Sequence, residues 1–213
     1  MNILILGPTW RNDPIKEFLE TRGDQVFMSN DRVDLAFAQK YKIDWILSSG
    51  YGPILKDPLV SHYKDRIVNL HATYLPYGKG IGTTFFGFLA GTPAGVSLHF
   101  IDSGIDTGDI LFRKKIEPKP DDTLRTFYAT LLDELRLFFI EKWDDLQNGR
   151  YERIRQQDLN IDVDYHSRVE SEKFMDLLPL KWDTPIEFVK KLGADFSLGK
   201  EFWQHYDDEI KGL

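Results

Sequence analysis

Three polar residues of this 213-residue sequence have the types and spacing needed for acyl transfer to an amine. They are Asn69, His71 and Asp106. Such a transfer requires a donor for the oxyanion of a tetrahedral intermediate, a group that exchanges protons near neutral pH, and an acceptor for the proton of the attacking nitrogen. An amide, an imidazole and a carboxylate supply these functions in that order. We therefore treat the three residues as candidate catalytic groups.

The predicted elements around these residues favour a shared site. Residues 67–71 (IVNLH) form an apolar run typical of a strand, and Asn69 and His71 point to the same side because they are two positions apart. They lie near the carboxyl end of the strand, where open α/β sheets bind ligands. Asp106 lies in residues 104–108 (GIDTG), a glycine-flanked loop between two predicted strands, which allows the carboxylate to turn back toward the strand end.

Each of the three residues also has an ordinary structural interpretation. His71 alone is compatible with a hydrogen-bonded, half-buried imidazole. Asp106 alone suits a turn, and Asn69 alone suits a cap at a strand end. The catalytic interpretation therefore depends on the three occurring together.

The N-terminal two thirds of the sequence predict an α/β fold. Short apolar runs at residues 1–6, 25–28, 45–48 and 67–71 alternate with helical patterns. This alternation predicts a Rossmann-like, mostly parallel sheet with helices on both faces. The longest predicted helix spans residues 123–147 and ends at Gly149. Its apolar stripe consists of Leu124, Phe127, Leu131, Leu132, Leu135, Phe138 and Phe139.

The pattern changes after Gly149. Two short β-like pieces, at residues 151–156 and 161–165, are followed by short helices. One of these helices is predicted to begin at Thr184-Pro185, with Glu187 three positions after Thr184 as in a capping box. The chain is thus expected to add a short α+β tail to the α/β core.

We place the catalytic core at residues 1–150 and the tail at residues 151–213. The tail strands are too small to bury a core of their own, and an isolated hairpin is marginal in water. They therefore predict a homodimer interface, since a two-fold contact is the commonest way to cover such strands. The alternative is that they pack against the sheet of the core.

Composition limits the classes of function. The absence of cysteine excludes disulfides and thiol catalysis, and a start of MNILILGPTW without a basic leader leads us to expect a cytoplasmic protein. No apolar run approaches the ~20 residues that span a bilayer. A net charge of −7 argues against nucleic acid as a partner, because nucleic-acid binding uses basic patches.

Four sequence blocks occur together in the first 148 residues. They are Asn69-Leu70-His71, Leu75-Pro76, residues 95–99 (GVSLH) and residues 101–108 (IDSGIDTG). In this order and spacing they resemble the formyltransferase superfamily that includes glycinamide ribonucleotide transformylase and methionyl-tRNA formyltransferase. The resemblance implies a catalytic role for Asn69, His71 and Asp106 and a supporting role for His99.

The same resemblance implies N10-formyltetrahydrofolate as co-substrate, without a metal. Residues 50–55 (GYGPIL) stand where the family has a loop that holds the pterin ring. The implied folate-binding residues, several acting through backbone atoms, are Ile54, Leu55, Ile101, Asp102 and Asp106. The three aliphatic residues are equally compatible with ordinary core positions.

The segment after His71 bears on the acceptor. Residues 72–80 (ATYLPYGKG) and the later residues 165–185 resemble the branch that formylates amino groups of nucleotide-linked dideoxy sugars, which implies a place in lipopolysaccharide O-antigen biosynthesis. Tyr77 and Lys79 are then candidate substrate contacts, Lys79 through a diphosphate. Thr9 and Trp10, which follow the first strand, are further candidates.

Residues 81–86 (IGTTFF) depart from that branch, which often has Asn-Pro-Asn followed by Trp. Two alternatives therefore stay open. The acceptor could be another small amine of the glycinamide ribonucleotide type, or water in formylfolate hydrolysis. Alternatively, the protein could be a non-catalytic module that binds nucleotide sugars or folate.

Overall fold

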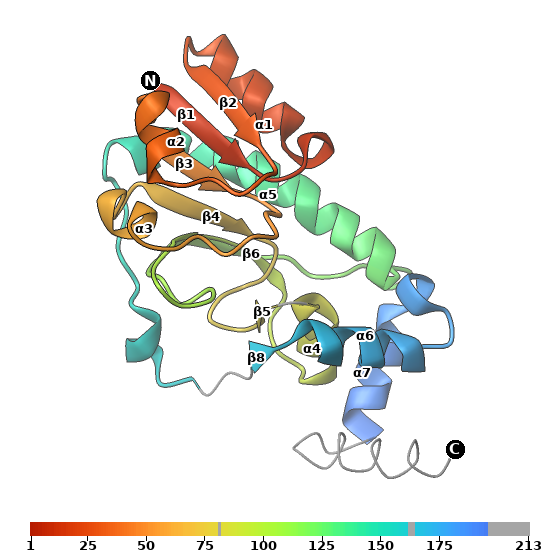
Figure 1. Ribbon diagram of the computed structural model, residues 1–213. Helices are drawn as coiled ribbons and strands as arrows, with labels where there is room; N and C mark the ends of the chain where they lie inside the picture. The colour runs from red at the N-terminus through yellow and green to blue at the C-terminus, as the bar shows by residue number, and fades with distance from the viewer. Residues whose placement is uncertain (81, 162–164, 196–213) are drawn as a thin grey trace.

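A six-stranded sheet forms the centre of this protein, with strand order β2-β1-β3-β4-β6-β7 (Figure 1). The computed structural model describes residues 1–80, 82–161 and 165–195. The strands are β1 (Asn2–Leu6), β2 (Gln25–Ser29), β3 (Trp45–Ser48), β4 (Ile67–His71), β6 (Gly95–Phe100) and β7 (Ile110–Lys115). The first four are parallel, and β6 is antiparallel to both of its neighbours, β4 and β7. The predicted mostly parallel α/β fold is confirmed.

Helices cover both faces of the sheet, as Figure 1 shows. They are α1 (Thr9–Thr21), α2 (Leu35–Lys40), α3 (Leu59–His62) and α5 (Leu124–Gln147). Because side chains alternate along a strand, β1 contributes to two apolar layers. Ile3 and Ile5 pack in the layer formed with α1 and α5, whereas Leu4 and Leu6 pack in the layer formed with α2 and α3.

The long helix α5 begins where the sequence predicts. Thr123 caps it, since its Oγ1 accepts a hydrogen bond from the backbone N–H of Thr126 at 3.2 Å. The seven residues of the predicted apolar stripe are all buried. None of the helices in the described part of the chain is long and apolar enough to cross a membrane.

The remaining elements lie on the side of β6 away from β2, below the sheet in the view of Figure 1. They are β5 (Lys79–Gly80), α4 (Thr83–Leu89), η1 (Gln156–Leu159), β8 (Tyr165–His166), α6 (Arg168–Leu177), η2 (Lys181–Asp183) and α7 (Ile186–Asp195). β5 pairs with β8 in a separate two-stranded sheet. Phe85 of α4 stacks on Phe174 of α6 with ring centroids 5.0 Å apart, and α7 packs against α4. The predicted boundary at residue 150 stays a prediction.

Two tail predictions are corrected. The piece at residues 151–156 is not a strand, because only Ile154 pairs, in an antiparallel bridge with Ile110, before η1 begins at Gln156. The helix at Thr184-Pro185 exists, but Thr184 Oγ1 is buried with no hydrogen-bond partner among the described residues and forms no capping box. Backbone bonds to the start of α5 join this turn to the core instead. Most of the piece at 161–165 lies outside the described residues.

Candidate active site

Strands β4 and β6 bring three polar side chains together. Asn69 and His71 share one face of β4, and the antiparallel register places His99 of β6 directly opposite Asn69. Asn69 Nδ2 lies 3.1 Å from His99 Nε2. Asn69 and His71 therefore point to the same side of the sheet, as expected, and His99 lies on that side as well.

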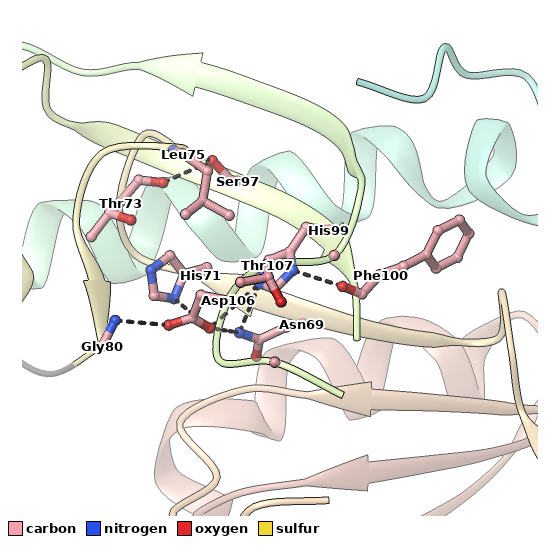
Figure 2. Close-up of polar contacts among 12 residues, drawn as sticks. Asn69, His71, Thr73, Leu75, Gly80, Ser97, His99, Phe100, Asp106 and Thr107 are labelled. Atoms are coloured by element: carbon pink, nitrogen blue, oxygen red, sulfur yellow. Dashed lines mark hydrogen bonds and ion pairs between the residues drawn. The ribbon is translucent and has the colours of Figure 1, made fainter. Parts of the chain in front are cut away.

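Asp106 reaches this cluster from the loop between β6 and β7 (Figure 2). Its Oδ1 accepts a hydrogen bond from Asn69 Nδ2 at 3.3 Å and lies 3.8 Å from His71 Nδ1. Its Oδ2 accepts the backbone N–H of Gly80 at 3.0 Å. In Figure 2 the His71 ring and the Asn69 amide lie on either side of the carboxylate. The structure thus brings the three candidate catalytic residues together.

His99 is held in one tautomer. Its Nδ1 lies 2.8 Å from the carbonyl of Phe100, which can only accept, so Nδ1 carries the proton and Nε2 accepts from Asn69. Burial of the ring, which is 1% exposed, followed by repulsion from His71, lowers the pKa of His99 to about 4. A neutral His99 therefore directs the NH₂ group of Asn69 toward Asp106.

His71 is oriented by a second carbonyl. Its Nε2 lies 3.0 Å from the carbonyl oxygen of Gly78 and donates to it. Its Nδ1 is therefore the atom that faces Asp106. This orientation leaves Nδ1 available to gain and lose a proton beside a carboxylate.

Opposing effects act on Asp106. Burial would raise the pKa of its carboxyl, but the charge of His71, the N–H of Gly80 and the charge of Lys79 together lower it. His99 adds little near neutral pH because its own pKa is about 4. Asp106 is thus ionised at neutral pH despite its side chain being only 14% exposed.

His71, His99 and Asp106 are also near enough to hold a metal ion, with ligand atoms within 4.8 Å of one another. The lone pair of His99 Nε2, however, already accepts from Asn69, and both carboxylate oxygens of Asp106 accept N–H groups. A metal would have to displace these hydrogen bonds. The donor set therefore suits a hydrogen-bonded acid–base site better than a metal site.

The predicted folate residues lie on two segments. Ile54 is 59% exposed, whereas Leu55 and Ile101 are partly buried against the core layer of α2 and α3. Asp102 Oδ1 accepts from Gly104 N and from Thr107 Oγ1, at 2.9 and 2.6 Å, so it stabilises the loop that carries Asp106. Their contacts with a folate stay a prediction.

The predicted substrate residues lie at the same edge of the sheet. Lys79 immediately precedes Gly80, whose N–H binds Asp106, and Tyr77 lies in the turn before it. Thr9 and Trp10 are exposed at the start of α1, after β1. β1 lies two strands from β4. A ligand that contacts both the start of α1 and the cluster on β4 would therefore span about 10 Å across the sheet.

The sequence interpretation missed Arg11, which follows Trp10. It is only 8% exposed, and it donates from Nε to Ser49 Oγ at 3.1 Å and from Nη1 to Tyr128 Oη at 3.2 Å. No ion pair among the described residues includes it. Gly50, at φ 71°, makes room for this side chain, because a Cβ there would lie 2.9 Å from Arg11 Cδ. No sequence signal marks Arg11, because its lack of a counter-ion is visible only in three dimensions.

The fold and the cluster define an α/β protein with a desolvated acid–base site at the carboxyl edge of a mostly parallel sheet. Residues 11–141 match the formyl transferase family. The chain belongs to this family.

Two curated relatives are similar over part of their length. Phosphoribosylglycinamide formyltransferase of Bacillus subtilis (strain 168) is 37% identical over 87 residues, which cover 40% of this chain and 45% of the relative. A methionyl-tRNA formyltransferase of Desulfotalea psychrophila is 31% identical over 147 residues, which cover 67% of this chain and 46% of the relative. The chain therefore spans about half the length of the curated relatives it matches.

A solved structure matches over nearly its whole length. The formyltransferase PseJ from Anoxybacillus kamchatkensis is 36% identical, with a TM-score of 0.79, and the match covers 89% of this chain and 97% of PseJ. That crystal structure is a complex with UDP-4,6-dideoxy-4-formamido-L-AltNAc and tetrahydrofolate. With 89% of this chain covered, the similarity to PseJ includes a large part of the tail, whereas the family match ends at residue 141.

Proposed function

We propose that this protein transfers a formyl group from N10-formyltetrahydrofolate to the amine of a nucleotide-linked amino sugar. The observation that carries the proposal is the convergence of Asn69, His71 and Asp106. Asn69 Nδ2 and His71 Nδ1 both lie within 4 Å of the Asp106 carboxylate. The 36% identity to PseJ over 97% of that protein supports the sugar acceptor.

The residues beside the cluster fit a folate. Ile54 and Ile105 are large apolar side chains that are 59% and 41% exposed, and such side chains suit the flat face of a ring. When bound, the folate supplies a formyl carbon attached to nitrogen. The chain's own residues then have to bind the developing oxyanion and move one proton.

Asn69 is suited to the oxyanion. Both of its N–H groups are engaged, one with His99 Nε2 at 3.1 Å and one with Asp106 Oδ1 at 3.3 Å. The longer bond is the one that can be exchanged for an oxyanion, while the bond to His99 keeps the amide oriented. A donor oriented before the reaction costs no reorganisation when the charge develops.

His71 and Asp106 manage the proton. Protonated at Nδ1, His71 places positive charge beside the oxyanion, and the ionised Asp106 stabilises that charge. Asp106 would then accept the proton of the attacking amine through a water molecule, and His71 would give its proton to N10 as the bond between the formyl carbon and N10 breaks. Desolvation strengthens both interactions, because the two side chains are only 13% and 14% exposed.

Arg11 supports a phosphorylated acceptor. A buried guanidinium without a carboxylate partner is costly unless a ligand supplies the negative charge. Arg11 lies at the start of α1, whose N-terminal N–H groups also attract anions. Arg11 would bind a phosphate of the nucleotide sugar at the β1 side of the site, and the exposed Trp10 would contact the nucleotide.

A second acceptor is favoured by one specific observation. The B. subtilis relative acts on phosphoribosylglycinamide by its name and is 37% identical to this chain over 87 residues. A phosphoribosyl amine would also supply an anion to Arg11. A non-catalytic binding module is the third possibility, which measured turnover would exclude.

Thermal unfolding in the presence of ligands tests the acceptor class. The panel is UDP-4-amino-4,6-dideoxy-L-AltNAc, dTDP-3-aminofucose and glycinamide ribonucleotide, each with tetrahydrofolate. A ligand at 100 times its Kd stabilises the protein by about 2.7 kcal/mol. We expect a nucleotide sugar to stabilise most, and larger stabilisation by glycinamide ribonucleotide would contradict the proposal.

The Arg11→Met variant sharpens this test. We expect it to bind the nucleotide sugar on the order of ten-fold more weakly, because a charge-assisted hydrogen bond is lost. The free variant should unfold at the wild-type temperature or higher, because an uncompensated buried charge is removed. Lys16→Met, on the exposed side of the same helix, is the matched control.

A further inference from the structure

The loop that carries Asp106 has an unfavourable local conformation. Asp106 has φ 53°, in the left-handed region that residues other than glycine rarely adopt. Gly108 lies so close to β6 that a Cβ there would be 1.9 Å from the carbonyl oxygen of Phe100. Such a conformation persists only where surrounding contacts hold it.

Gln156 supplies two of these contacts. Its Nε2 donates to the carbonyl oxygen of Asp106 at 2.8 Å and to that of Gly108 at 2.7 Å. These carbonyls lie on either side of Thr107, so one amide group joins both ends of the turn. The Gln156 side chain is only 7% exposed, and it lies outside the region matched to the family, residues 11–141.

The chemistry of the two partners fixes the orientation of this amide. Both are carbonyl oxygens, so the NH₂ group must face them and the Oε1 atom must face away. That Oε1 is buried without a hydrogen-bond partner among the described residues. An acceptor left in this state is unfavourable, so the two N–H donors are what this position provides.

Neighbouring residues fasten the same segment to the loop. Ile154 and Ile110 exchange backbone hydrogen bonds of 2.9 and 3.0 Å. Arg153 pairs with Asp109 at 2.9 Å and with Asp65 at 2.8 Å. Residues 153–156 are here termed the strap. Three of them, Arg153, Ile154 and Gln156, contact the segment from Asp106 to Ile110.

We infer that Gln156 is a positioning residue, which acts through the backbone of the loop to hold the Asp106 carboxylate beside Asn69 and His71. The inference rests on the proposed function for its kinetic consequence, but its structural part is independent of any substrate. The strap thereby makes a segment beyond the family region part of the catalytic apparatus. A misplacement of a catalytic group by about 1 Å can cost on the order of 100-fold in rate.

The first test compares Gln156→Met with Gln157→Met. A methionine side chain has a length similar to that of glutamine but no donors, and Gln157 is the exposed neighbour of the same type. We expect kcat with the nucleotide sugar to fall about 10- to 100-fold only in Gln156→Met, with a much smaller change in KM. Equal kcat values in the two variants would overturn the inference.

A double-mutant cycle separates positioning from loss of stability. If Gln156 acts through Asp106, Gln156→Met should lower kcat little further in an Asp106→Asn background, because the group it positions is already disabled. Additive effects of the two substitutions on kcat would contradict the inference. Thermal unfolding of each variant verifies that it is folded under the assay conditions.

Gln156→Glu replaces only the NH₂ group of the side-chain amide, by an oxygen that is a donor only when it is protonated. Its protonated carboxyl has a single O–H donor, whereas its carboxylate has none and faces two carbonyls. Its kcat relative to the wild type should therefore rise as the pH falls from 8 to 6. A ratio that is constant across this range would count against the role of the donors.

An NMR measurement keeps this inference distinct from the proposed reaction. In the free protein at pH 7, the ring signals of His71 and His99 should shift in Gln156→Met and stay in place in Gln157→Met, because the Asp106 charge moves relative to both rings. Unchanged signals would overturn the inference even if formyl transfer is observed. Shifted signals without turnover on any amine would leave the inference standing and contradict the proposed function.

Discussion

Asp106 combines burial with ionisation, and the loss of its charge tests the proposed mechanism. Asp106→Asn preserves shape, and His71→Ala removes the imidazole next to it. Each should lower kcat by on the order of 10²–10⁴, the range for one acid–base participant. Circular dichroism should show folding near that of the wild type. Near-wild-type turnover in either variant would contradict the assignment.

His99 links the site to acid stability. Its pKa is about 4 in the folded protein, whereas an unperturbed histidine has a pKa of about 6.5. Between these pH values the unfolded chain binds a proton that the folded chain does not, so the free energy of unfolding decreases as the pH falls from 6.5 to 4, by up to about 3 kcal/mol.

Urea unfolding between pH 5 and 7 measures this effect. His99→Gln should show a shallower loss of stability with falling pH than the wild type, whatever its absolute stability. His62→Gln, at an exposed histidine, is the control and should keep the wild-type slope. An unchanged slope in His99→Gln would contradict the buried, neutral state of His99.

Among single residues, the sequence predicts those whose place in the site follows from their spacing along the chain. Asn69 and His71 are two positions apart on one strand, so their common face follows from strand geometry. Asp106 follows from the glycine-flanked loop and the family resemblance. Arg11 and Gln156 do not follow, because their significance lies in a missing counter-ion and in two carbonyl partners far away in the sequence.

Helices α4 and α7 pack so closely that there is no room for a side chain at Gly193 of α7. A Cβ on Gly193 would lie 2.2 Å from the carbonyl oxygen of Leu89. Gly193→Ala should therefore destabilise the protein by about 1–3 kcal/mol through overpacking, although alanine favours a helix interior by about 1 kcal/mol. Lys191→Ala, on the exposed side of α7, is the control for chemical denaturation. A more stable Gly193→Ala variant would contradict the packing of α7 on α4.

The sequence predicts long elements better than short ones. The helix at residues 123–147 carries a strong stripe and a capping threonine, and the structure confirms it. The β-like piece at residues 151–156 is predicted from its local pattern alone. Only Ile154 pairs with another strand, at Ile110, and the chain turns into η1 at Gln156, so no strand forms. The pairing of Ile154 is set by a distant strand that no local pattern identifies.

The homodimer is a prediction for the whole molecule. Tyr151 packs near Phe100 and Phe112, and Ile154 pairs with Ile110, so these residues are covered by their own chain. The exposed large apolar residues of the described part of the tail are Ile161, Val169, Leu177, Leu180 and Phe188.

Light scattering at micromolar concentration tests the dimer. The wild type should have twice the mass of one chain, and Ile161→Glu should shift it toward one chain, because Ile161 is an exposed residue of the second predicted tail piece and the substitution places charge in the predicted interface. Leu137→Glu, at an exposed leucine of α5, is the control and should stay dimeric. A single-chain mass for the wild type would contradict the prediction.

Transfer of a labelled formyl group tests the central claim most directly. N10-formyltetrahydrofolate carrying ¹³C in its formyl group is mixed with the protein and UDP-4-amino-4,6-dideoxy-L-AltNAc, dTDP-3-aminofucose or glycinamide ribonucleotide, and the ¹³C spectrum is recorded. The proposed function predicts a new formamide signal on a nucleotide sugar, formed by the wild type and on the order of 10²–10⁴ times more slowly by Asp106→Asn. Label that stays on the folate, appears only as formate, or moves to glycinamide ribonucleotide alone would contradict it.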